Sequence, residues 1–323
     1  MKKKSKDYKV LIDKIKQEIS KTVVGQEVVI DGLLRAVISN GHVLLEGVPG
    51  IAKTLIVRTL SKVTRCSFNR IQFTPDLLPT DIIGITAYEE KKGFFTLKGP
   101  IFNNFILADE INRAPPKVQS ALLEGMQEKQ VTIGKETFPL PHPFFVLATQ
   151  NPIESLGTYP LPEAQIDRFL FKLNIDYPTQ TDEQHILKKN ITLKRFDEYK
   201  LNPVISPEEI MALQSDVKNV YLDNKIEKYI IRLVDCTRKS EQYKIKLGKY
   251  IEYGASPRAS IGLFIASKAD ALIKGDLFVT PHHVKRVAAD VLRHRLILNY
   301  EGQAEGIKTD NVIEEILSKV PIP

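Results

Sequence analysis

The sequence predicts an α/β domain with a parallel sheet, followed by an all-helical domain. A glycine-containing loop joins the apolar run at residues 43–45 to a segment with helical periodicity, and a second apolar run, residues 105–108, ends in two carboxylates. From about residue 181 the pattern is helical, with repeated capping signals. The 323 residues exceed the usual size of a single core, so we place the domain boundary between residues 178 and 179.

The loop at residues 47–54 carries the side chains of a phosphate-binding loop. In such loops glycines let backbone N–H groups approach the phosphates, and the following helix N-terminus adds positive potential. Lys53 is expected to reach the β- and γ-phosphates, and the Thr54 hydroxyl to ligate Mg²⁺. The predicted ATP contacts in and after this loop are Gly47, Pro49, Gly50, Ile51, Ala52, Lys53, Thr54 and Leu55.

Ala52 departs from the usual pattern, which has glycine immediately before the lysine. Alanine is the smallest alternative and is compatible with a helix N-terminus, and Gly47 and Gly50 remain to form the turn. An ordinary Gly-Pro turn with an incidental lysine is the structural alternative. The carboxylate pair farther along the chain favours the phosphate-binding interpretation.

Asp109 and Glu110 follow the second apolar run, at the strand end where open α/β sheets bind ligands. Asp109 is predicted to hold Mg²⁺ from the side opposite Thr54. Glu110 is predicted to orient and deprotonate the attacking water, because phosphoryl transfer asks the protein mainly for positioning and charge stabilisation. The loop and the carboxylate pair together imply ATP hydrolysis.

The N-terminal segment, residues 7–38, is predicted to form helices that break at residues 23–27. This polar-flanked turn lies just upstream of the first strand. We therefore expect Val24 and Gln26 to help seat the adenine.

An insertion is predicted between the two halves of the phosphate site. Residues 68–73 alternate like a strand, and residues 74–81 have turn chemistry that can cap a helix. Roughly 55 residues separate Lys53 from Asp109, whereas a strand–helix–strand unit needs only about thirty. Residues 82–101 are therefore expected to project from the core.

Three further elements complete the α/β domain. A helix is predicted to begin at residues 114–117, and residues 130–140 form two short alternating runs around a Gly-Lys turn, which predicts a β-hairpin. Residues 144–149 read as a buried strand that ends just before Asn151. Asn151 either contacts the γ-phosphate or the attacking water, or serves as an ordinary turn former before proline.

The predicted helical domain contains one cation in an unusual place. Its helix starts are indicated by caps at residues 181–183, 206–209, 223 and 280–281. Arg258 lies in the first turn of another helix, where the helix dipole disfavours a cation unless a partner such as phosphate compensates. This placement suggests a functional role for Arg258.

Composition excludes several classes of protein. The net charge is +7, but basic residues are mixed with acids and no basic stripe interleaved with aromatics is present, so nucleic-acid binding is not favoured. Cys66 and Cys236 lack metal-ligand or disulfide spacing, and no histidine is assigned a metal. No apolar stretch approaches the roughly 18 residues of a membrane span. A soluble, cytoplasmic protein is expected.

Four segments together resemble the MoxR family of AAA+ ATPases, and the resemblance covers nearly the whole chain. They are residues 47–54 with Ala52, residues 108–116, residues 148–152 and residues 157–169. Alanine before the loop lysine is common in that family. The resemblance implies an αβα core with a five-stranded parallel sheet, an insertion at 82–101, a hairpin at 130–140 before the sensor residue, and a helical lid.

The resemblance also implies roles for specific residues. Asn151 corresponds to the residue that senses the γ-phosphate, Arg168 to an arginine finger offered to the neighbouring subunit's ATP, and Arg258 to a second sensor in the lid. Arg113 is a weaker candidate for an intersubunit contact. A surface ion pair with Asp167 or Glu163 is the structural alternative for Arg168.

The resemblance further implies a homo-oligomeric ring, usually hexameric, that acts on protein clients and often has partners containing von Willebrand factor A domains. A DNA or RNA motor related to the minichromosome-maintenance helicases and a magnesium-chelatase-like motor subunit share the same insertions and stay open as alternatives. A nucleotide-regulated scaffold with negligible turnover is disfavoured, because every expected site residue is present.

Overall fold

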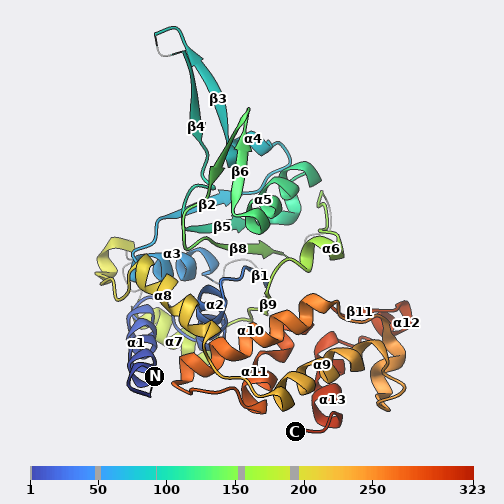
Figure 1. Ribbon diagram of the computed structural model, residues 1–323. Coiled ribbons are helices and arrows are strands. Elements are labelled where there is room, and N and C mark those ends of the chain that lie inside the picture. The colour runs from blue at the N-terminus through green and yellow to red at the C-terminus, as the bar shows by residue number, and fades with distance from the viewer. Residues whose placement is uncertain (1, 48–51, 92, 152–156, 190–195) are drawn as a thin grey trace.

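The computed structural model describes residues 2–47, 52–91, 93–151, 157–189 and 196–323, with side chains from residue 7 onward. A central sheet carries a long hairpin on one side, and the C-terminal helices gather on the other (Figure 1). Within these ranges no helix combines the length and apolarity needed to cross a lipid bilayer.

Five parallel strands form the central sheet in the order β2-β5-β8-β1-β9. The strands are β1 (Val43–Glu46), β2 (Phe68–Gln72), β5 (Phe105–Asp109), β8 (Phe145–Gln150) and β9 (Phe171–Asn174). The first four match strands predicted from the residues. The sequence pattern did not locate β9, because its alternation extends over only four residues, of which Phe171 and Leu173 are buried.

Alternate residues of β1, β5 and β8 face two different hydrophobic clusters, as expected for a sheet covered on both faces. Leu45, Leu107 and Leu147 belong to the cluster formed with α2 (Glu27–Ile38) and α3 (Lys53–Val63). Their neighbours, including Leu44, Ile106 and Val146, belong to the cluster formed with α4 (Pro79–Ile83) and α5 (Pro116–Glu128). The predicted αβα core is confirmed.

Two antiparallel hairpins extend from the α5 side of the sheet (Figure 1). Strands β3 (Gly84–Glu89) and β4 (Gly93–Lys98) form the longer one, within the segment predicted as an insertion. Strands β6 (Gln130–Ile133) and β7 (Glu136–Pro139) form the shorter one. The two hairpins are in contact where Gly134, in the turn of the shorter one, faces Thr86 of β3. A Cβ added at Gly134 would lie 2.8 Å from the Thr86 hydroxyl oxygen.

The C-terminal region is mainly helical and also contains a two-stranded antiparallel sheet of β10 (Ile251–Tyr253) and β11 (Ile297–Leu298). Several predicted caps are formed: the Ser206 hydroxyl accepts the Glu209 N–H, and the Asp223 carboxylate accepts the Lys225 N–H. The helices are α7 (Gln180–Lys189), α8 (Pro207–Lys218), α9 (Asn224–Arg238), α10 (Pro257–Lys274), α11 (Pro281–Leu292), α12 (Tyr300–Ala304) and α13 (Thr309–Lys319).

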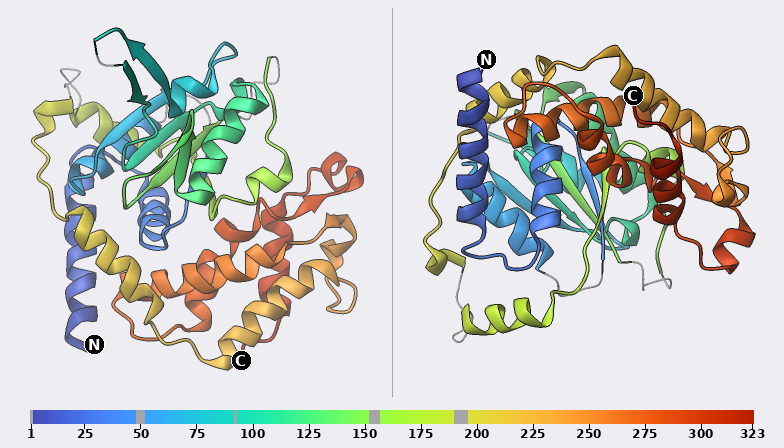
Figure 2. Two further views of the ribbon diagram at one scale, coloured as in Figure 1. Left: turned by 45° about the horizontal axis from the view of Figure 1, so that its top comes forward. Right: turned by 90° about the horizontal axis from the view of Figure 1, so that it is seen from below.

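The two regions share one hydrophobic core. Helix α2 packs against α8 and α10, and α1 (Lys2–Ile19) packs against α3 and α10. Figure 2 shows these helices close together beneath the sheet. The remaining elements are short: α6 (Glu163–Ile166) and the 3₁₀ helices η1 (Ile111–Arg113), η2 (Phe196–Tyr199) and η3 (Lys246–Tyr250). Packing across the proposed boundary at 178–179 is therefore extensive.

Candidate active site

Lys53, the lysine of the predicted phosphate loop, is the first residue of α3, the element that follows β1 along the chain. Its ammonium group donates a hydrogen bond to the Gly47 carbonyl. Burial lowers the pKa of Lys53, and the carboxylates of Asp109, Glu110 and Glu46 partly oppose that shift. The cation is thus directed toward the end of the sheet that carries the predicted catalytic acids.

Ala52 has φ 57° and ψ 24°, in the left-handed region that favours glycine. The sequence-based expectation treated Ala52 only as a small residue at a helix start. The structure adds that its backbone is left-handed, which is the conformation that explains the glycine of the general pattern. Thr54 and Leu55 follow in the first turn of α3 and are partly buried. Three other predicted ATP contacts, Pro49, Gly50 and Ile51, lie outside the described residues.

Asp109 ends β5 and is held by two neighbouring strands. Its Oδ1 accepts a hydrogen bond from the Thr149 hydroxyl at 2.6 Å. Its Oδ2 accepts from Arg70 Nη2 at 2.6 Å and from Arg70 Nε at 3.0 Å. The Thr54 hydroxyl and the Asp109 carboxylate are oxygen ligands of the kind that Mg²⁺ prefers, so the chemistry of these residues fits the predicted metal.

Glu110 also has a left-handed backbone, with φ 57°. Its Oε2 accepts from Gln72 Nε2 at 2.7 Å and from Arg113 Nη1 at 2.9 Å, and its backbone N–H donates to the Thr149 hydroxyl at 2.8 Å. Arg113, considered a candidate for an intersubunit contact, is here an ion-pair partner of Glu110. The carboxylate that we assign as the base is fixed by two donors.

Asn151 follows β8, the strand that pairs with both β5 and β1. Only 6% of its surface is exposed. Because the carboxyl ends of parallel strands share one edge of a sheet, Asn151 lies at the same edge as Asp109, Glu110 and the loop after β1. This edge therefore brings Glu110 and Asn151 together with Lys53 and Asp109.

The predicted adenine segment lies between α1 and α2 and contacts the chain beyond β9. Gln26 Nε2 donates to the Asp176 carbonyl at 3.1 Å. Gly25 has φ 72°, and a Cβ added there would lie 2.6 Å from the Asp182 Cγ. Val24 and Gln26 are partly buried in this turn. Segments from both sides of the proposed domain boundary thus meet at this turn.

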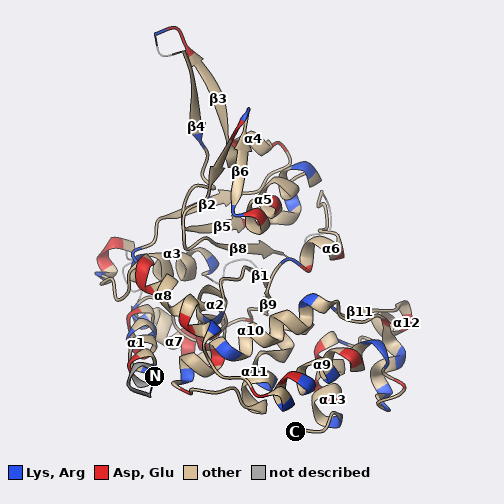
Figure 3. Cartoon of the chain, viewed as in Figure 1, with Lys and Arg blue, Asp and Glu red and all other residues tan. Residues whose placement is uncertain are grey.

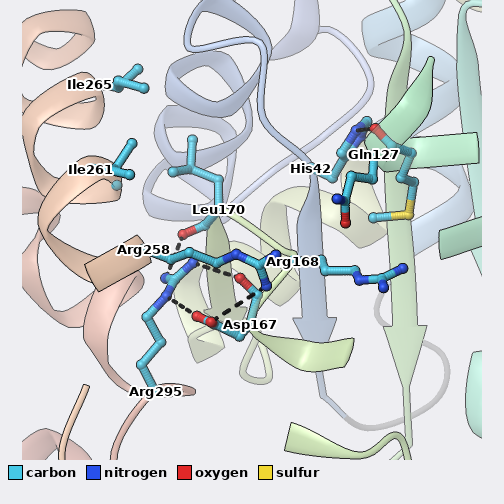
Figure 4. Close-up of a pocket in the computed structure, with 11 residues that line it drawn as sticks. His42, Gln127, Asp167, Arg168, Leu170, Arg258, Ile261, Ile265 and Arg295 are labelled. Atoms are coloured by element: carbon cyan, nitrogen blue, oxygen red, sulfur yellow. Dashed lines mark hydrogen bonds and ion pairs between the residues drawn. The ribbon is translucent and has the colours of Figure 1, made fainter. Parts of the chain in front are cut away.

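Arg168 and Arg258 lie elsewhere, beside a cavity of about 300 Å³ between the start of the sheet and α10 (Figure 4). The cavity is lined by His42, Met126, Gln127, Asp167, Arg168, Leu170, Arg258, Ile261, Gly262, Ile265 and Arg295. His42 immediately precedes β1, and its carbonyl accepts the Leu170 N–H at 2.9 Å. The two arginines are therefore at the edge where β1 and β9 begin.

The length of β1 separates these arginines from the phosphate loop. The strand has four residues, which at about 3.3 Å each span roughly 13 Å. Lys53 follows the end of β1, whereas the segment that carries Arg168 is bonded to the residue before its start. Within one chain, the two arginines do not reach the edge that carries Glu110.

Arg168 is exposed and makes no ion pair with Asp167 or Glu163, its expected alternative partners, among the contacts of the described chain. Figure 4 shows its side chain pointing away from Asp167. Arg258 lies with Nη1 3.6 Å from Asp167 Oδ2 and remains half exposed. Both guanidinium groups therefore keep exposed donors.

Four contributors to the site were not identified from the sequence. Arg70 and Gln72 stand on β2, and they reach the carboxylates only because β2 pairs with β5, with Gln72 opposite Asp109. Thr149, on β8, donates to the Asp109 carboxylate and accepts the Glu110 backbone N–H. Arg295 binds the segment before β9 from the far end of the chain. For Gln72 and Thr149, a polar side chain near a strand end was the available signal, and strand order was the missing information.

Comparisons with known proteins cover almost the whole chain. Residues 42–171 match the model of the ATPase family associated with various cellular activities, and residues 248–316 match that of the AAA lid domain. The chain is 47% identical to chaperone MoxR1 of Mycobacterium tuberculosis, over 95% of this chain and 81% of that protein. It is 44% identical to protein YeaC of Bacillus subtilis, over 98% and 96% of the respective chains.

The fold also has a solved counterpart. The crystal structure of a presumed ATPase from Cytophaga hutchinsonii superimposes with a TM-score of 0.93 at 50% sequence identity. The match covers 99% of this chain and 97% of the other. The sheet, its helices and the C-terminal region are therefore shared as one arrangement.

Proposed function

The chain belongs to the MoxR family of AAA+ ATPases, and on that basis we propose that it hydrolyses ATP with Mg²⁺ as a homo-oligomeric, hexameric ring to remodel, assemble or activate protein clients. One observation supports the ring above all others. Arg168 and Arg258 lie at the sheet edge opposite Lys53 and Glu110. A head-to-tail neighbour would bring the two edges together, and this contact forms a ring when its repeated rotation closes on the first subunit.

The residues divide the chemical work between two subunits. Lys53 binds the β- and γ-phosphates, Thr54 and Asp109 hold Mg²⁺, Glu110 activates water and Asn151 orients it. Arg168 and Arg258 of the next subunit stabilise the charge of the transferring phosphoryl group. An arginine supplied in this way is worth about 10³ to 10⁵ in rate in other phosphoryl-transfer enzymes.

We propose that the client is a protein and that partners with von Willebrand factor A domains are the first to test. The β3–β4 hairpin extends well beyond the core and exposes Tyr88 and Phe94, whose ring centroids are 5.1 Å apart. Lys and Arg are interspersed with Asp and Glu along the chain (Figure 3). Mixed charges and exposed aromatics suit a protein better than a polynucleotide backbone.

We also assign the protein to the cytoplasm. Cys66 and Cys236 are free and buried, and burial raises the pKa of the Cys66 thiol to about 11 and that of Cys236 to about 12. Thiols of this kind suit a reducing compartment and take no part in the proposed chemistry.

The ring is tested by measuring ATP hydrolysis against protein concentration, together with the mass in solution with ATP and Mg²⁺. We expect specific activity to rise as the subunits assemble, and Arg168→Ala to abolish this rise while it still assembles. Activity independent of concentration, or an assembled Arg168→Ala ring with normal turnover, would contradict the proposal.

Glu110→Gln tests the assigned base, because glutamine keeps the shape and hydrogen bonding but cannot accept the proton. Turnover should fall by about 10² or more, the usual contribution of a general base, while ATP remains bound. Near-normal turnover in this variant would rule out Glu110 as the base.

A further inference from the structure

We propose that Asp167 is a positioning residue that holds Arg168 and Arg258 as one unit for the neighbouring subunit's ATP. The inference rests on the proposed function of those arginines and adds a role for the cluster around Asp167. This cluster consists of Asp167, Arg258 and Arg295, which Figure 4 shows, together with Ser256.

The Asp167 carboxylate has three partners from two parts of the C-terminal region, the start of α10 and the segment after α11. Its Oδ1 accepts from Arg295 Nε at 2.7 Å. Its Oδ2 accepts from the Ser256 hydroxyl at 2.9 Å and lies 3.6 Å from Arg258 Nη1. The residue immediately before Arg168 is thus bound to the region that carries Arg258.

Arg295 fixes the backbone around Arg168. Its side chain is 3% exposed, and its guanidinium donates to the carbonyls of Asp167 at 3.1 Å, Phe169 at 2.7 Å and Leu170 at 3.1 Å. A buried cation needs a matched anion as well as neutral acceptors. Asp167 is the carboxylate with which Arg295 forms an ion pair in the described chain.

Ser256 extends the connection to the second arginine. Its hydroxyl caps α10 by accepting the Arg258 N–H at 3.2 Å, while the same oxygen donates to Asp167. A displacement of Asp167 would therefore change both the segment that carries Arg168 and the first turn of α10. The carboxylate fixes the spacing of two guanidinium groups that otherwise belong to separate regions of the chain.

The expected effect is a loss of turnover without loss of ATP binding. Asp167→Asn keeps the size of the side chain but removes the charge opposite Arg295 and Arg258. We expect kcat to fall at least tenfold, while the Kd for ATP, set by Lys53 and its loop at the other edge, stays within twofold. Ser256→Ala leaves the Asp167–Arg295 ion pair in place and should show a smaller fall of the same kind.

Mixed rings separate a positioning role from a purely structural one. Mixing Asp167→Asn with Glu110→Gln places the intact arginines of one variant beside the intact phosphate site of the other. In randomly mixed rings about one site in four becomes complete, so activity should reappear. Mixing Lys53→Ala with Glu110→Gln damages the same phosphate site in both subunits and should restore nothing.

A parallel mixture of Arg168→Ala with Glu110→Gln tests the proposed function alone. If this mixture regains activity but folded Asp167→Asn does not, the inference about Asp167 is wrong and the trans arginine stands. If neither mixture regains activity, the proposed ring chemistry fails. Thermal unfolding checks that each variant is folded, and Ser256→Ala takes the place of Asp167→Asn in the mixture if the latter does not fold.

Discussion

Ala52 and Glu110 both adopt left-handed backbone conformations. Ala52 directly precedes α3, and Glu110 directly follows β5, so the two residues flank the predicted phosphate site. A non-glycine residue in this region costs of order 1–3 kcal/mol and persists only where the surroundings enforce it. At Glu110, the enforcing contacts are the Thr149 hydroxyl on the backbone N–H and the donors on the carboxylate. These contacts hold the strained residue, and with it the carboxylate, at the edge of the sheet.

Substitutions at Ala52 should follow backbone conformation rather than side-chain size. Ala52→Gly should keep ATP binding at the level of the original protein, because glycine adopts φ 57° without steric cost. Ala52→Val should weaken ATP binding at least tenfold, because a β-branched residue is poorly tolerated there. Titration with a fluorescent ATP analogue measures both, and equal binding by the two variants would contradict the argument.

His42 is a buried histidine that immediately precedes β1. Its Nδ1 accepts the Val146 N–H at 3.1 Å, and its Nε2 lies 3.2 Å from the Met126 carbonyl and from the Lys129 ammonium. Protonation would set a second N–H against the Val146 donor. Burial, followed by the charge of Lys129, lowers the pKa of His42 well below its usual value.

This arrangement predicts the direction of one pH dependence. The folded pKa is below the unfolded value of about 6.5, so the unfolded state takes up a proton first and stability falls as the pH drops below 6.5. His42→Asn should reduce that slope by up to about 1.4 kcal/mol per pH unit. Urea unfolding between pH 5 and pH 7 measures it, with exposed His185→Asn as the control whose slope should match the original protein.

At the scale of elements, helices α2, α10 and α11 are joined by a buried charge network. The Asp270 side chain is fully buried, 3.3 Å from Arg35 Nε and 3.6 Å from Arg286 Nη1. Arg35 also contacts Asp290 at 3.2 Å. The network links the N-terminal helices to the C-terminal region through charges that have little access to water.

Removing one carboxylate from this network should be costly. Asp270→Ala leaves buried cations without their anion and should lower the free energy of unfolding by about 3 kcal/mol or more. Glu301→Ala removes an exposed partner of Lys249, 3.9 Å away, and should leave stability unchanged. Chemical denaturation of both variants makes the comparison, and equal effects would show that burial of the network adds nothing.

Elements with strong local signals were predictable. The strands before the phosphate loop and before Asp109 have continuous apolar runs, and the capped helices α8 and α9 start where their side chains indicate. The segment that became β9 was not, because four residues give too little alternation to distinguish a strand from a loop. It is extended because β1 offers it a parallel partner.

At the scale of the whole molecule, one hydrophobic cluster runs from the sheet through α2 to the helices of the C-terminal region. The core and the lid should therefore unfold together. We expect calorimetry of the dilute protein without nucleotide to give one transition whose calorimetric and van't Hoff enthalpies agree. Two separated transitions would show that the proposed domains at 1–178 and 179–323 are energetically independent.

The sequence alone determined the local motifs of this protein. A phosphate loop, two adjacent carboxylates after a strand, hairpin turns and helix caps are encoded by residues that are neighbours along the chain, so their spacing reveals them. The arrangement of Arg168 and Arg258 depends instead on packing between distant segments: Arg295 meets Asp167 across more than a hundred residues, and strand order brings Gln72 to Glu110. Such contacts depend on how the sheet and the helices pack, and this packing cannot be predicted from the local sequence pattern.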